Sequence, residues 1–181
     1  ADWDPVLDEH QELVVGTRDM PIPEWRRTYR FAHLASAAYN LRLLRVVLQY
    51  LDEGLGLDLV DYVAFLYERT ADAAPASVFG AIGREVDRFL DSILAGGAFT
   101  LPHRAAGPAP LEPAHAIVAT ALERTDDFLA EAEALTRRFL RGRGLEPAAL
   151  QDAFRYQALI TPRRGQAAPV TLELLHDWPA F

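Results

Sequence analysis

The chain has 181 residues, of which 50% are hydrophobic, 24% are charged and none is cysteine, and its formal net charge is −8. This length suits one domain with a sizeable core, and the hydrophobic content excludes a disordered tail. The lack of cysteine excludes disulfides, thiolate metal sites and cysteine nucleophiles within the chain. All 18 basic residues are arginines, so lysine chemistry is excluded too, and the negative charge gives no general attraction to nucleic acid.

The start of the sequence indicates a fragment of a larger protein. The first residue is Ala1 and the single methionine is Met20, so we expect a chain that is either processed or, as we favour, cut from a longer protein. Asp2, Asp4 and Asp8 stand where a signal peptide needs basic and then apolar residues. No run of about 18 uncharged apolar residues occurs, so no membrane span is predicted, and a cytoplasmic location is expected.

The first 21 residues are predicted to be irregular, apart from a short strand at residues 13–15. The segment Pro21-Ile22-Pro23-Glu24 then has the proline and the acid that favour a first helical turn. Because neither proline nor glycine follows until Gly54, we predict one long helix over about residues 23–52.

Further helices are predicted from caps and periodicity along the rest of the chain. They cover residues 58–70, 76–94, 113–141 and 146–160. Residues 96–113, rich in proline, are interpreted as an extended internal linker, and residues 170–175 are expected to pair with residues 12–15. The predicted fold is therefore mainly α: a single domain over residues 1–181, an irregular bundle of about five helices with a small two-stranded β pairing of the terminal segments.

The predicted long helix has a polar row on the side that should be buried. The row consists of Tyr29, His33, Ser36 and Asn40, spaced by four, three and four residues. A buried polar group without a hydrogen-bond partner costs about 1–3 kcal/mol, so the row needs partners. Two interpretations stay open: the side chains bond to neighbouring helices or backbone, or they line a surface that faces a ligand or another domain.

Other candidate chemistry finds little support in the sequence. None of the five histidines has a second histidine or a carboxylate at a metal-ligand spacing, so no metal site is predicted. The acids between residues 123 and 133 are interpreted as a solvated helix face, and no serine lies in a nucleophile motif. Gly80 and Gly83 indicate close helix packing rather than a phosphate loop. No catalytic residue is assigned.

Several segments resemble one family. These are Val14-Val15-Gly16-Thr17-Arg18-Asp19-Met20, Trp25, Tyr39-Asn40-Leu41-Arg42 and the closing segments 156–160 and 170–174. Together they are similar to the region after the barrel in cobalamin-dependent radical S-adenosylmethionine (SAM) enzymes. There a strand followed by Thr-x-x-Met leaves the barrel and a helical C-terminal domain begins. The resemblance extends loosely from residue 12 onward.

The resemblance implies a parent enzyme with a cobalamin-binding domain and a barrel whose four-iron cluster is bound by Cys-x-x-x-Cys-x-x-Cys. Such enzymes use S-adenosylmethionine, commonly to methylate a carbon of a small molecule in natural-product biosynthesis. Because this chain lacks cysteine, no cluster, S-adenosylmethionine or cobalamin ligand carries over to it. The remaining role is to cover the barrel and bind substrate, with Thr17, Arg18 and Met20 nearest the barrel and the polar row facing the substrate.

A different class of protein also fits the pattern. The chain could be a stand-alone helical ligand-binding or dimerisation module, such as the effector domain of a bacterial regulator. In that case the amphipathic segments 76–94 and 113–141 would form the dimer face. Neither hypothesis includes nucleic acid or a membrane as a partner.

Overall fold

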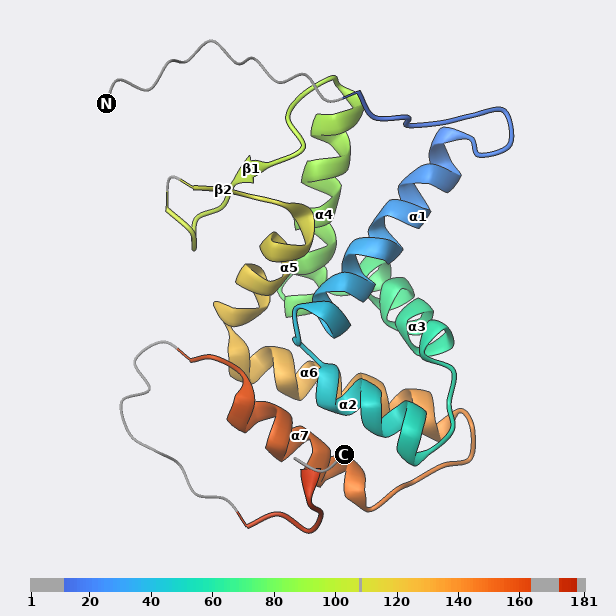
Figure 1. Ribbon diagram of the computed structural model, residues 1–181, viewed down its shortest axis with the longest axis vertical. Helices are drawn as coiled ribbons and strands as arrows, with labels where there is room; N and C mark the ends of the chain where they lie inside the picture. Colours follow the sequence, from blue (N-terminus) through green and yellow to red (C-terminus); the bar gives the residue numbers. More distant parts are fainter. Residues whose placement is uncertain (1–11, 108, 164–172, 179–181) are drawn as a thin grey trace.

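The computed structural model describes residues 12–107, 109–163 and 173–178. These residues form a mainly helical fold with one small antiparallel pair of strands, as the sequence predicts (Figure 1). The elements are α1 (Ile22–Ala35), α2 (Arg45–Gln49), α3 (Leu59–Asp72), α4 (Val78–Leu94), β1 (Leu101–Pro102), β2 (Pro110–Leu111), α5 (Pro113–Leu122), α6 (Thr125–Arg141) and α7 (Ala149–Ile160). Two single turns, Ser36–Asn40 and Tyr50–Gly54, are π-helical.

One hydrophobic core runs through the whole bundle. Helix α4 packs against α5 and α3, α1 packs against α3 and α5, and α2 packs against α7 (Figure 1). The apolar side chains of α4, α5 and α6 are buried in this core, for example Ile82, Ile117 and Phe128. The expected dimer face on segments 76–94 and 113–141 is therefore wrong, because those apolar faces cover one another within the chain.

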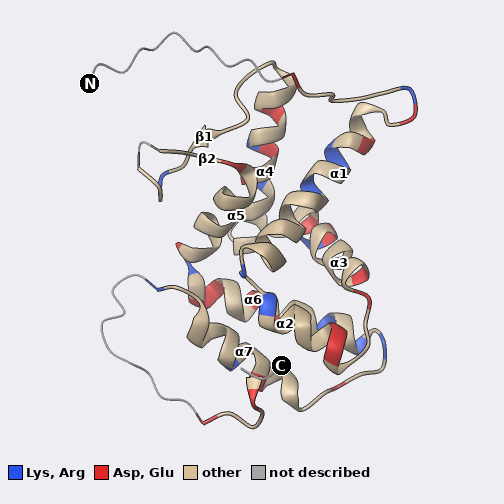
Figure 2. Cartoon of the chain, in the orientation of Figure 1, with Lys and Arg blue, Asp and Glu red and all other residues tan. Residues whose placement is uncertain are grey.

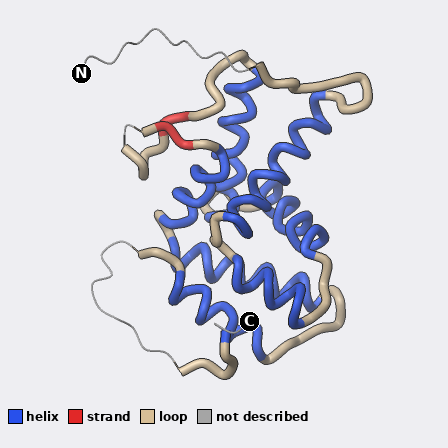
Figure 3. The backbone as a smooth tube through the Cα atoms, in the orientation of Figure 1, coloured by secondary structure: helices blue, strands red, loops and turns tan. Residues whose placement is uncertain are grey.

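The two-stranded sheet lies inside the segment 96–113 (Figure 3). Leu101 is opposite Leu111, and the buried His103 that follows β1 contacts Thr120 of α5 through its Nε2, 3.1 Å from Oγ1. The segment is thus packed against α5 and is not the extended linker that we predicted. The expected pairing of the terminal segments does not form at residues 12–15, which are not a strand, and residues 170–172 lie outside the described residues.

The predicted helix over residues 23–52 is broken at Leu41–Leu44. Arg42 has a φ of +63°, a left-handed conformation that L-residues other than glycine rarely adopt. The break turns the chain so that α2 packs against α7, with Leu43, Leu44 and Val47 in the core. Neither proline nor glycine marks this break, so the sequence gives no local signal for it.

A buried side chain of α7 holds the break in place. Gln157, which is fully buried, accepts a hydrogen bond from the Val46 amide at 3.0 Å and donates to the Arg42 carbonyl at 3.2 Å. Its Nε2 also donates to Thr161 Oγ1, at 3.2 Å. We call this set of hydrogen bonds the Gln157 clamp. It satisfies backbone groups that the interrupted helix leaves without intrahelical partners.

The second long predicted helix is also divided, into α5 and α6, at Glu123–Arg124. Helix α6 then lies beside the start of α4, where Glu131 accepts hydrogen bonds from the amides of Val78 and Phe79 at 2.9 and 3.2 Å. Glu131 thereby caps α4 and does not belong to a solvated face, as the sequence had suggested. A carboxylate is favourable there because helix N-termini carry partial positive charge.

Close packing at the two glycines of α4 is confirmed. A Cβ atom at Gly80 or Gly83 would lie 2.5 Å from the carbonyl oxygen of Ala74 or of Thr70, respectively. That separation is far shorter than a van der Waals contact, so α4 lies this close to the end of α3 only because both residues lack a side chain.

The C-terminal segment is attached to α7 through a buried carboxylate. Oδ2 of Asp152 accepts hydrogen bonds from the amides of Leu175 and His176 and, at 2.7 Å, from the indole Nε1 of Trp178. Burial raises the pKa of Asp152, but these hydrogen bonds outweigh it and leave the pKa below its ordinary value. Trp178 is buried, and its ring makes an edge-to-face contact with the ring of Tyr50, with the ring centroids 5.5 Å apart.

We expect Asp152→Asn to destabilise the protein at pH 7 by about 1–3 kcal/mol, because a neutral amide replaces a charged acceptor. The folded pKa lies below the unfolded value of about 3.9, so the carboxylate stabilises the fold above that pH and this contribution is lost as the pH falls through the folded pKa. Urea denaturation between pH 7 and pH 3 should show the two proteins converging at low pH. The exposed Glu173→Gln variant is the control, and a constant difference at every pH would contradict the prediction.

Candidate functional site

The polar row predicted from the sequence lies on one side of α1 and the π-helical turn that follows it. Helical spacing places three rings next to one another along α1. The ring centroids of Trp25 and Tyr29 are 5.0 Å apart, those of Tyr29 and His33 are 4.3 Å apart, and both pairs of rings are tilted. Phe99, from the connection between α4 and β1, lies 6.3 Å from His33. The rings therefore form a continuous aromatic surface between α1 and the connection.

The polar row finds almost no partners within the described residues. The Tyr29 hydroxyl is buried and has no hydrogen-bond partner. Asn40 Nδ2 lies 3.5 Å from Ser36 Oγ, which joins two members of the row to each other and not to another helix. His33 is half-buried and makes a ring contact with Tyr29. Within the described residues, the Tyr29 hydroxyl is thus the member of the row that is buried without a partner, although most buried polar groups in proteins are satisfied, whereas Asn40 is exposed and is not on a buried side as predicted.

The electrostatic surroundings keep the two ring groups of the row neutral. Burial, and then the negative charge of Glu112 at the start of α5, raise the pKa of the Tyr29 phenol. Burial lowers the pKa of the His33 imidazole, and the Glu112 charge opposes that shift. At neutral pH the phenol can donate one hydrogen bond and the imidazole can both donate and accept. Such a set suits a polar but uncharged group held among aromatic rings.

The residues predicted to contact another domain lie just before α1. The Thr17 amide donates to the Met20 carbonyl at 2.8 Å, and the Met20 amide donates to Thr17 Oγ1 at 3.0 Å. These reciprocal hydrogen bonds close the Thr-x-x-Met segment into a turn in which Thr17, Arg18 and Met20 are all exposed. The exposed turn leads directly into the helix that carries the polar row.

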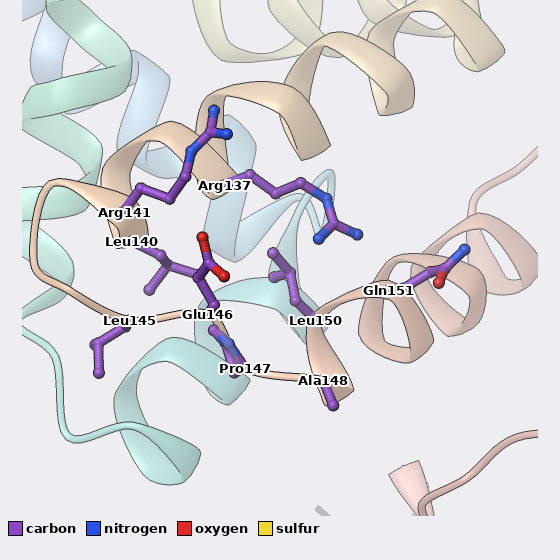
Figure 4. A pocket seen from close by; sticks show the side chains of 9 residues that line it. All are labelled: Arg137, Leu140, Arg141, Leu145, Glu146, Pro147, Ala148, Leu150 and Gln151. Atoms are coloured by element: carbon purple, nitrogen blue, oxygen red, sulfur yellow. The ribbon is translucent and has the colours of Figure 1, made fainter.

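A pocket of 360 Å³ lies between the end of α6 and the start of α7 (Figure 4). Its walls include Arg137, Arg141, Glu146 and Gln151 above an apolar floor, and in Figure 4 the Arg137 side chain extends over the pocket towards Gln151. Arg137 is paired with Glu133 at 2.6 Å, and the Glu146 carboxylate adds an opposing charge. Arginines in the last turn of a helix are expected from its dipole alone, so this pocket has no distinct ligand preference.

The described residues contain neither a metal-binding cluster nor a membrane-spanning helix. No group of three or more His, Asp or Glu side chains in those ranges could hold a metal ion, and no helix there is both long and apolar enough to cross a membrane. An iron–sulfur cluster needs thiolate ligands, which a chain without cysteine cannot supply, so the residues present do not fit that group.

Comparison with protein-family models, curated proteins and solved structures gives no match for this chain. Function must therefore be inferred from the site itself. The sequence predicted the polar row, because its period follows from helix geometry. It missed Phe99 and Glu112, which come from distant segments and lie near the row only in the folded chain.

The unpaired hydroxyl of Tyr29 gives an unusual stability prediction. Tyr29→Phe should leave the free energy of unfolding within about 0.5 kcal/mol of wild type or raise it, because no hydrogen bond is lost. The matched variant is Tyr62→Phe, which removes a buried hydrogen bond of 2.6 Å to Thr136 and should cost about 1–2 kcal/mol. Chemical denaturation compares the two, and equal losses would show that the Tyr29 hydroxyl has a partner within the fold.

Proposed function

We propose that this chain is the C-terminal domain that covers and binds the substrate of a cobalamin-dependent radical SAM methyltransferase. The enzyme would act on a small molecule in natural-product biosynthesis, in the cytoplasm. The polar row of α1 supports the proposal most directly, because it displays hydrogen-bonding groups that the rest of the described fold leaves unused.

The aromatic surface around the polar row suits substrate binding. A bound molecule would supply a partner for the Tyr29 hydroxyl, and a buried hydrogen bond of this kind is worth about 1 kcal/mol. The flanking rings of Trp25 and Phe99 would exclude water from the same place. Radical intermediates require such exclusion, because solvent would otherwise quench them.

The turn before α1 supplies the second part of the proposal. Thr17, Arg18 and Met20 would contact the preceding radical SAM and cobalamin-binding domains, which are the partners proposed for this chain. Because the turn leads straight into α1, a contact there would set the position of the polar row relative to the barrel. The position of the polar row would in turn set the orientation of the bound substrate for reaction.

The cofactors are proposed to belong to parts outside this chain. The four-iron cluster, S-adenosylmethionine and cobalamin would supply the methyl group and the radical that abstracts hydrogen. The residues of this chain would bind the substrate, orient it and exclude water, and none of them would be catalytic. A stand-alone ligand-binding module is the alternative, and it differs in needing no such preceding domains.

The gene provides a first test. The coding sequence upstream of Ala1 should contain the Cys-x-x-x-Cys-x-x-Cys motif of a radical SAM barrel. An upstream region that encodes a DNA-binding domain instead, or a start codon immediately before Ala1, would contradict the proposal and favour the stand-alone module.

The full-length enzyme provides the functional test. His33→Ala and Asn40→Ala should each lower kcat/KM by about tenfold, which corresponds to one lost hydrogen bond to the substrate. The melting temperature should stay within about 2 °C of wild type, because Asn40 is exposed and the contacts of His33 among the described residues are ring contacts with Tyr29 and Phe99 rather than hydrogen bonds. Gln151→Ala, an exposed amide on α7, is the control. Loss of stability with unchanged turnover would assign the row a structural role.

A further inference from the structure

A second pocket lies where the predicted long helix breaks, and the proposed function does not use it. It has a volume of 330 Å³ and is formed by the break, α2 and α7 together with the C-terminal segment. This size is at the lower end of the range for small-molecule sites. Its lining residues are Arg42, Arg45, Val46, Gln49, Tyr156, Ile160 and Trp178. We call it the arginine pocket.

The charge of the arginine pocket is opposite to that of the protein. Two guanidinium groups line it and no carboxylate does, in a chain whose net charge is −8. Within the described ranges, neither Arg42 nor Arg45 forms an ion pair with an acid, and Arg45 lies over the ring of Tyr39 at 5.6 Å. In Figure 2 the break and the start of α2 are blue, and acidic residues appear only at the far end of this segment. The pocket thus has an excess of positive charge.

The backbone at Arg42 is strained, which gives a second and independent indication of a site. Its φ of +63° lies in the left-handed region, which is unfavourable for an arginine and which glycine adopts freely. A π-helical turn precedes the break and another follows α2, and such turns are frequent at functional sites. Strain of this kind persists where the surrounding structure fixes it, and here the Gln157 clamp does so.

Apolar and aromatic side chains line the rest of the arginine pocket, together with Gln49 of α2. Trp178 is buried, donates a hydrogen bond to Asp152 and makes an edge-to-face contact with the ring of Tyr50. Tyr156 and Ile160, one turn apart on α7, also line the pocket. The pocket therefore combines positive charge from the break and α2 with aromatic rings from α7 and the C-terminal segment.

We propose that the arginine pocket binds an oxyanion, a carboxylate or a phosphate monoester, carried on an aromatic or apolar small molecule. The guanidinium groups of Arg42 and Arg45 hold the oxyanion, since planar arginine forks match both groups. The rings of Tyr156 and Trp178 contact the apolar body. This site goes beyond the proposed function, and neither depends on the other.

Trp178 provides a direct optical probe of the arginine pocket. In a chain carrying Trp3→Phe and Trp25→Phe, Trp178 is the remaining tryptophan, and its fluorescence is followed during titration. Phenyl phosphate and benzoate are the two anionic probes, and benzyl alcohol is the neutral one. We expect saturable binding of at least one anion and none of the alcohol. The anion that binds more tightly shows whether the pocket prefers a phosphate or a carboxylate group.

Substitutions assign the binding to the two arginines. Arg42→Gln with Arg45→Gln should weaken anion binding at least about tenfold, because two charge-assisted hydrogen bonds are lost. The control is Arg141→Gln, which removes the same charge from the pocket in Figure 4 and should change nothing. Arg42→Gly tests the same point in a variant that should fold. Because glycine adopts the left-handed conformation freely, this variant should melt at or above the wild-type temperature, and it should bind the anion more weakly than wild type does.

Four results would overturn the proposal. The first is the absence of saturable binding by either anion. The second is equal binding of benzyl alcohol, which would leave only an apolar pocket. The third is the same anion affinity in wild type and in the double arginine variant. The fourth is a loss of anion affinity in Arg141→Gln as large as the loss in the double arginine variant. Because His33 and Asn40 lie outside the arginine pocket, failure here would leave the role of the polar row untouched.

Discussion

Gln157 bonds to the Arg42 carbonyl within the break and to the Val46 amide in the first turn of α2, and this contact determines how the first third of the chain is folded. At the break, Leu43 and Leu44 lie in the core, α1 packs against α3 and α5, and α2 packs against α7. Both candidate sites follow from this arrangement: the polar row ends at the break, and the arginine pocket begins there.

The two surfaces differ in the chemistry that they offer. The polar row is neutral and lies beside aromatic rings, and its first member, Tyr29, has a buried hydroxyl without a partner among the described residues, so the row suits an uncharged polar group. The arginine pocket is positive and strained at Arg42, and so it suits an anion.

The sequence predicted those parts of the structure that local rules control. Asp58 caps α3 through the Val60 amide, and the apolar period of α4 matches its buried side. The polar row was likewise predictable from spacing. The break at Arg42 was not, because it is imposed by a glutamine more than a hundred positions away. For the same reason the role of Glu131 as a distant cap, and the place of the strand pair, could not be inferred from neighbouring residues.

Native-state hydrogen exchange of the Val46 amide tests the Gln157 clamp most directly. If Gln157 accepts this hydrogen, Val46 should exchange only about as fast as global unfolding allows, although it stands next to an irregular break. In Gln157→Ala its exchange should accelerate far more than that of Ile82 in the core of α4. Rapid exchange of Val46 in the wild type, or the same rate in both proteins, would contradict the clamp and the origin of both sites.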